Sequence, residues 1–223
     1  MQIGPVRSHF QQEAHVYQGE KFNSISHVVG AALALAGLAV LVVLASLKGD
    51  PWKIVSFSVY GSALVSLYTC SSLYHSFKGK AKEVFRKLDH FMIYLLIAGT
   101  YTPITLVTLR ENHAAWGWSI FAVVWGLAVF GIFTDALTTK GPRILPVVIY
   151  LLMGWLLVVA LKPMSQELPA GGFAWLIAGG LAYTLGVVFY AMDTKVRHFH
   201  GIWHLFVLAG SVSHFLAVLL YIL

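Results

Sequence analysis

Charged residues are scarce in this sequence: Asp, Glu, Lys and Arg make up only 11% of its 223 residues. A soluble domain usually carries about 25%, so a surface that mainly faces water is excluded. Hydrophobic residues make up 58% of the chain, and the mean hydropathy is +0.77. The one cysteine, Cys70, cannot form a disulfide within the chain and therefore says little about the compartment. This composition predicts a membrane protein.

Several other features are missing or weak. The net charge of +6 could suggest a nucleic-acid partner, but the charges lie between apolar runs and form no amphipathic stripe, so we expect no nucleic acid to bind. Residues 1–24 are mostly polar and contain no short apolar core of the kind that a cleavable signal has. We therefore expect this stretch to be a cytosolic lead-in. No soluble domain, low-complexity segment or transporter-like repeat is evident.

Seven apolar runs are each long enough to cross a bilayer, which takes roughly 20 residues of helix. Strands of a membrane barrel alternate in polarity over about 10 residues, whereas these runs are longer and continuously apolar. The sequence therefore predicts an all-α fold, a bundle of seven transmembrane helices that forms one domain over residues 25–223. The predicted spans are 25–47, 54–77, 88–109, 114–134, 143–162, 172–192 and 201–222.

Proline and glycine mark the joints between these spans. Lys48-Gly-Asp-Pro51 separates the first two, and Lys140-Gly-Pro142 precedes the fifth, with its proline suited to the first turn of a helix. Lys162-Pro163 is expected to close the fifth span. Pro103 lies inside the third run and predicts a kink there, which neighbouring helices in a bundle tolerate.

Lys and Arg are distributed unequally between the two sides of this bundle. The N-terminus and the connections on its side hold 11 of the 15 basic residues. The connections on the other side hold the rest, Lys48, Lys53, Arg110 and Lys162. Because basic loops are retained in the cytosol, we expect a cytosolic N-terminus and, with seven spans, a C-terminus outside.

Ionisable side chains also occur at the ends of the predicted spans. Burying such a side chain in the membrane is costly, so the residues that do so usually have a function. With the topology above, all of these ends fall at one depth, in the cytosolic leaflet. The residues are His27, His75, Asp89, His200 and His204.

The last two of these histidines are four residues apart, which places both imidazoles on one helix face. Two such nitrogens can bind one metal if a third ligand comes from another helix, and His75 is suited to that position. Three histidines with one open position describe a catalytic zinc site. Alternatively, the histidines lie at the interface or hydrogen-bond between helices. Ser71 lies four residues before His75, on the same face.

Asp89 has two interpretations. It could form an ion pair with Arg86 or Lys87, or it could face the bundle and accept a proton from a water that the metal activates. In the second case Ser71 could hydrogen-bond the same water or a substrate carbonyl. His214 lies about 15 Å deeper than His204, at 1.5 Å per residue. We expect it to make a buried hydrogen bond between helices.

Three sequence blocks resemble the hemolysin III branch of the progestin and adipoQ receptor family, over nearly the full chain. The blocks are Glu20-Lys-Phe-Asn23-Ser-Ile-Ser26-His27-Val-Val-Gly30, then Ser71-Ser-Leu-Tyr-His75 with Lys87-Leu-Asp89-His, and His200-Gly-Ile-Trp-His204. Ser26 replaces the threonine of many members but keeps the hydroxyl. The run Ile97-Ala-Gly-Thr-Tyr-Thr-Pro103 is typical of bacterial members, so we expect an integral protein of the bacterial inner membrane.

The resemblance implies Zn²⁺ held by His75, His200 and His204, with Asp89 and Ser71 beside the water that the zinc binds. Glu20, Asn23 and His27, from the first block, would then support the site. Relatives include adiponectin receptors and alkaline ceramidases, which suggests hydrolysis of a lipid amide or ester. The expected partners are membrane lipids and a fatty-acyl substrate or ligand. The alternatives are a membrane sensor or receptor with structural zinc and a pore-forming protein, while the substrate and the oligomeric state stay open.

Overall fold

The computed structural model describes residues 19–137 and 143–223, and every regular element within them is helical. Seven helical stretches of this described part are long and apolar enough to cross a membrane, which confirms the predicted fold class. The predicted joint Lys140-Gly-Pro142 and residues 1–18 of the lead-in lie outside the described residues. The elements are α1 (Glu20–Lys48), α2 (Pro51–Ser76), α3 (Gly79–Pro103) with η1 (Ile104–Leu109), α4 (Ala114–Leu137), α5 (Ile144–Gly154), η2 (Leu156–Ala160), α6 (Leu161–Glu167), α7 (Ala170–Met192), and α8 (Phe199–Ala217) with η3 (Val218–Ile222).

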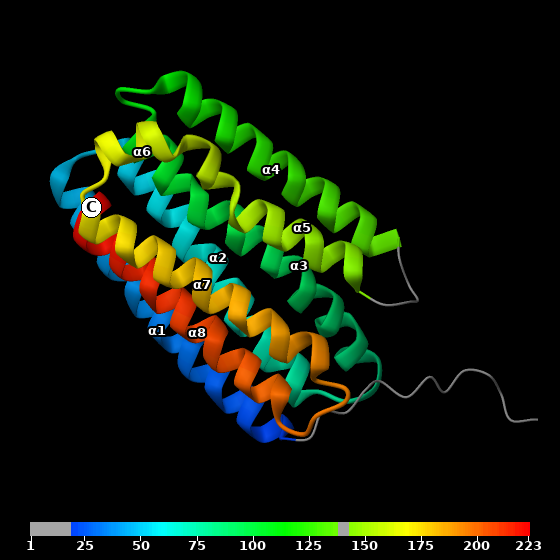
Figure 1. The fold of residues 1–223 in the computed structure, drawn as a ribbon. Coiled ribbons are helices and arrows are strands. Elements are labelled where there is room, and N and C mark those ends of the chain that lie inside the picture. Colours follow the sequence, from blue (N-terminus) through cyan, green and yellow to red (C-terminus); the bar gives the residue numbers. More distant parts are fainter. Residues whose placement is uncertain (1–18, 138–142) are drawn as a thin grey trace, which may run out of the picture.

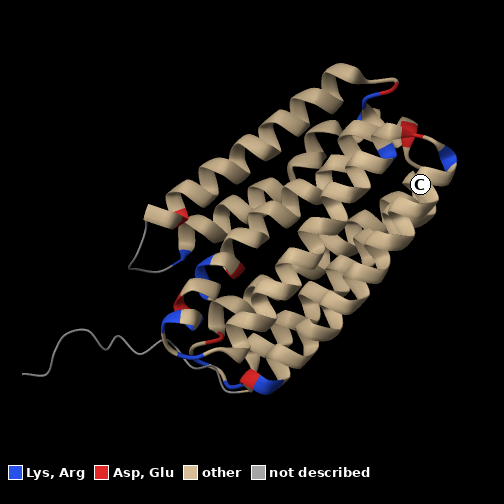
Figure 2. Cartoon of the chain, turned by 180° about the vertical axis from the view of Figure 1, so that it is seen from behind, with Lys and Arg blue, Asp and Glu red and all other residues tan. Residues whose placement is uncertain are grey.

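The spans run up and down, so the start of α1 and the α2–α3 and α7–α8 connections gather at one end of the bundle, opposite the C-terminus (Figure 1). Helix α1 packs against α2 and α8, and α2 also packs against α3. In the described part of the chain, Lys, Arg, Asp and Glu lie toward the two ends of the bundle, and its long middle carries none (Figure 2). Which end faces the cytosol stays a prediction from the loop charges.

The joint between α1 and α2 forms where the sequence predicts it. Gly49 takes a left-handed conformation, with φ of 69°, that favours glycine and ends α1. The Asp50 carboxylate then accepts hydrogen bonds from the backbone N–H groups of Trp52 and Lys53, at 2.9 and 3.2 Å, and caps α2. Pro51 occupies the first turn, where its missing N–H costs nothing.

Two helices begin earlier than hydropathy indicates. Helix α3 starts at Gly79 instead of residue 88, and α1 starts at Glu20, inside the stretch 1–24 that was expected to precede the domain. The added turns of α3 hold three lysines, one arginine and one glutamate, so no apolar run marks them. They nevertheless bury one polar side chain, Lys82, which lies at the end of the bundle where α1 begins.

The fifth span is broken in the middle, and its predicted end at Lys162-Pro163 is wrong. Helix α5 stops at Gly154, and the chain continues through η2 and α6 to Glu167. Pro163 lies in the first turn of α6, where a proline is tolerated. The Tyr101 hydroxyl of α3 donates to the Gly154 carbonyl (3.0 Å) and accepts from the Leu157 N–H (2.9 Å). These bonds satisfy backbone groups that the bilayer cannot solvate.

Candidate metal centre

Three buried histidines converge at the end of the bundle where α1 begins. His75 comes from the last turn of α2, and His200 and His204 come from the first turns of α8. Their ring centroids lie 5.0 Å apart for His75 and His200, 4.9 Å for His75 and His204, and 4.8 Å for His200 and His204. One nitrogen of each ring lies within 4.8 Å of the other two, so the three side chains can hold a metal ion together.

Carboxylates orient two of these rings. The Nδ1 atom of His75 bonds to Glu20, and the Nδ1 atom of His200 bonds to Asp193 at 2.7 Å. An ionised carboxylate only accepts hydrogen bonds, so each Nδ1 carries a hydrogen and Nε2 is the nitrogen through which each of these rings could bind a metal. The two Nε2 atoms lie 3.3 Å apart. Carboxylate–histidine pairs of this kind support metal ligands in proteins, so the donor set fits a divalent metal that prefers nitrogen.

His27, the histidine of the first sequence block, lies next to this group without joining it. The His27 ring stacks on the His204 ring, with centroids 3.7 Å apart and an angle of 13° between the planes. The edge of His27 also meets Tyr68, at 5.0 Å. His27 therefore supports one face of His204.

Asn23 is fully buried where α1 meets α8. A Cβ placed on Gly201 would lie 3.1 Å from the Asn23 Oδ1 atom, which is tighter than ordinary van der Waals contact. Glycine between the two histidines of α8 therefore lets α1 approach the site closely. This approach brings Glu20, one turn before Asn23, against His75.

Asp89 and Ser71 lie together beside the histidines. The Ser71 hydroxyl, His200 and Arg143 all lie close enough to the Asp89 carboxylate to favour its negative charge. In the described part of the chain, no ion pair joins Asp89 to Arg86 or Lys87, so the arrangement favours the interpretation in which Asp89 faces the site.

Two other histidines within the bundle, His90 and His214, have structural partners. His90 is turned away from the site, and the Arg143 guanidinium donates to its Nδ1 atom at 2.6 Å. The His214 Nε2 atom hydrogen-bonds the Leu176 carbonyl of α7 at 3.1 Å, which confirms the predicted interhelical bond.

Sequence reasoning missed two charged residues of this region, Asp193 and Lys82. Both lie among other charged residues in or next to a connection, where a solvated side chain is the ordinary expectation. In the structure the Asp193 side chain is only 6% exposed and that of Lys82 only 7%. A long helix beginning at Gly79 would have been needed to place Lys82 against α1.

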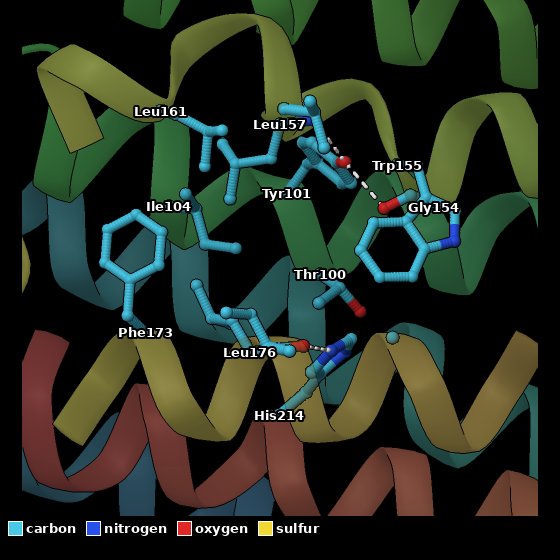
Figure 3. A pocket seen from close by; sticks show the side chains of 13 residues that line it. Thr100, Tyr101, Ile104, Gly154, Trp155, Leu157, Leu161, Phe173, Leu176 and His214 are labelled. Atoms are coloured by element: carbon cyan, nitrogen blue, oxygen red, sulfur yellow. Dashed lines mark hydrogen bonds between the residues drawn. The ribbon is translucent and has the colours of Figure 1, made fainter. Parts of the chain in front are cut away.

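An apolar pocket lies in the other half of the bundle, where the fifth span is broken (Figure 3). It occupies about 550 Å³, including the part that is open to the outside. Leu157, Leu161, Phe173 and Leu176 line it. The rings of His214 and Trp155 also line it, and their nitrogens hydrogen-bond the Leu176 carbonyl and the Thr184 hydroxyl. His214 lies ten residues beyond His204 on α8, about 15 Å along the helix axis, so the pocket is separate from the histidine group.

The fold and this site define an integral, multi-pass membrane protein with a buried group of three histidines at one end of its bundle. The family described as Haemolysin-III related matches residues 15–215, and the chain belongs to this family. It is 42% identical to Hemolysin-3 of Bacillus cereus over 202 residues, which cover 90% of each chain. It is 40% identical to the Hemolysin-3 homolog of Bacillus subtilis (strain 168), over 89% of this chain and 92% of that one. A human relative, monocyte to macrophage differentiation factor, is 28% identical over 90% of this chain and 83% of its own.

Proposed function

We propose that the protein is a zinc-dependent hydrolase of a lipid amide or ester, with Zn²⁺ held by His75, His200 and His204. The observation that carries this proposal is the group of three buried histidines, each offering one nitrogen to a common point, with Asp89 and Ser71 beside it. Three imidazoles are the protein ligands of several catalytic zinc sites, in which a fourth position is open. A closed structural site would need a fourth protein ligand.

Zinc bound in this position would polarise a carbonyl group and make hydroxide available near neutral pH. Asp89 would act as the general base, taking a proton from the attacking water on a carboxylate oxygen and passing it to the leaving amine or alcohol. The Ser71 hydroxyl, which lies next to that carboxylate, would orient it by donating a hydrogen bond. Glu20 and Asp193 hold the rings of His75 and His200 in the orientation that ligation requires.

A lipid is the substrate class that the surroundings favour. The histidines lie at one end of the seven candidate membrane spans, and a bilayer around those spans would bring lipid head groups and their first acyl bonds to this end. The basic stretch 78–87, which is mostly the first turns of α3, lies at the same end. It would attract anionic head groups, by about 1 kcal/mol for each basic residue near the surface.

The direct test is a lipid screen with purified, zinc-loaded protein in detergent, measuring released fatty acid. We expect turnover of at least one amide or ester lipid, its loss after a chelator removes the metal, and its return when zinc is added. Turnover that is indifferent to the chelator would contradict the proposal. Lipids that bind but are never cleaved would favour the receptor interpretation instead.

We further propose that the apolar pocket takes the far part of an acyl chain. Its lining is aliphatic and aromatic, which suits a hydrocarbon. Gly180 lines this pocket, and a Cβ there would lie 3.5 Å from the Trp155 ring, so Gly180→Phe would fill the space. We expect this variant to lose turnover of long-chain substrates while keeping that of short-chain ones. Gly126→Phe, at a position with nothing within 4 Å, is the control, and equal losses for both chain lengths would contradict this use of the pocket.

A further inference from the structure

One buried lysine stands apart from its neighbours at the start of α3. Lys78, Lys80 and Lys87 are exposed, whereas Lys82 is 5% exposed. Lysine is almost never fully buried unless it is paired. The Lys82 Nζ atom donates to Glu20 Oε1 at 2.7 Å and to the Tyr74 carbonyl at 3.3 Å. It also lies 4.6 Å from the centre of the Tyr74 ring, within the range of a cation–π contact.

Glu20 connects this lysine to the metal centre, because its second carboxylate oxygen bonds the Nδ1 atom of His75. The three side chains therefore form a series from α3 through α1 to α2. The Glu20 side chain is 20% exposed, so water could draw the carboxylate away from the ring if nothing held its other oxygen. The Lys82 ammonium holds that oxygen, in a partly buried setting where an ion pair is stronger than at an open surface.

We propose that Lys82 is a positioning residue for the metal centre, which acts through Glu20 to fix the orientation and the Nδ1–H tautomer of His75. The proposal rests on the proposed function only in that His75 must be a metal ligand. The two histidines that bond carboxylates, His75 and His200, are thus held in different ways. Asp193 holds His200 from the α7–α8 connection, whereas Glu20 holds His75 while its other oxygen accepts from a cation of another helix.

A plainer role for Lys82 is also visible. The Tyr74 carbonyl belongs to the last turn of α2, where carbonyls lack helical partners and a nearby cation is favourable. In that role Lys82 would stabilise the end of the helix without affecting how tightly the folded protein binds metal. Metal affinity, measured on folded protein, separates the two roles.

The experiment titrates full-length, metal-stripped protein with Co²⁺ in the presence of a competing chelator, following the visible absorption of the bound cobalt. Lys82→Met and Glu20→Gln are each expected to weaken binding by roughly 10- to 100-fold, the range for outer partners of metal ligands. Because the two residues act in series, the double variant should bind no more weakly than Glu20→Gln alone. The double variant also removes both charges together, which preserves folding if the single Lys82 variant is unstable. Lys80→Met, an exposed lysine two residues away, is the matched control and should bind as wild type does.

Three results have distinct meanings. If wild-type protein binds no cobalt, the proposed metal centre itself fails. If wild type binds and Lys82→Met binds equally well, or is only less heat-stable, the positioning role is wrong. If the double variant is weaker than Glu20→Gln by a further tenfold or more, Lys82 does not act through Glu20 and the series is wrong.

Discussion

Replacing Asp89 with alanine should abolish lipid hydrolysis while leaving the metal in place. We expect the turnover rate to fall by about 10²-fold or more, the usual contribution of a general base, and the zinc content to stay at the wild-type value. The reason is that Asp89 lies beside the three histidines and next to Ser71 but is not one of the three clustered ligands. Released fatty acid and zinc would be measured on the same purified samples.

Glu83→Ala provides the control for Asp89→Ala, because Glu83 is an exposed carboxylate on the same helix. It should change neither turnover nor zinc. Unchanged turnover in Asp89→Ala would contradict the hydrolase mechanism. Loss of zinc from that variant would instead make Asp89 a ligand, and the division of roles proposed above would be wrong.

Replacing His200 with alanine should remove the metal itself. His200 supplies one of three inward-facing nitrogens, and Asp193 would be left without the ring that it orients. We expect zinc affinity to fall by at least about 100-fold, the upper end of the range for losing only an outer partner. Bound zinc also stabilises the folded state, by about 2.7 kcal/mol at a concentration 100 times its dissociation constant.

The rise in melting temperature that zinc gives to wild-type protein should therefore disappear in His200→Ala. His113→Ala, a partly exposed histidine at the opposite end of the bundle, should keep both the zinc and the temperature shift. A His200→Ala variant that purifies with the normal amount of zinc would show that the histidine group is not the metal site.

The sequence predicts the architecture well because apolar length is what crossing a bilayer requires. All seven spans appear in the structure, and the Lys48–Pro51 joint forms as its residues indicate. The internal break at Gly154 is invisible to hydropathy, since the residues around it are as apolar as those of any helix. The break depends on Tyr101 of another span, and only the folded chain brings that hydroxyl to it.

The site could be predicted only in part. The i, i+4 spacing of His200 and His204 and a shared depth were enough to group them with His75. The pairing of His200 with His204 follows from helix geometry, which is local in the sequence, and the addition of His75 follows from the predicted topology. Asp193 and Lys82 contact residues on other helical elements. Nothing in the sequence distinguishes a buried carboxylate or ammonium from a solvated one when other charged residues surround it. Their places follow from how the helix ends pack.

The central claim is that the three histidines bind zinc, and X-ray absorption spectroscopy on wild-type protein, combined with elemental analysis, tests it most directly. We expect one zinc per chain, with imidazole nitrogens at about 2.0–2.1 Å in its first shell. A protein that holds no stoichiometric metal after purification without chelators, and takes up none when zinc is supplied, would contradict the claim. So would a bound zinc whose shell contains no histidine.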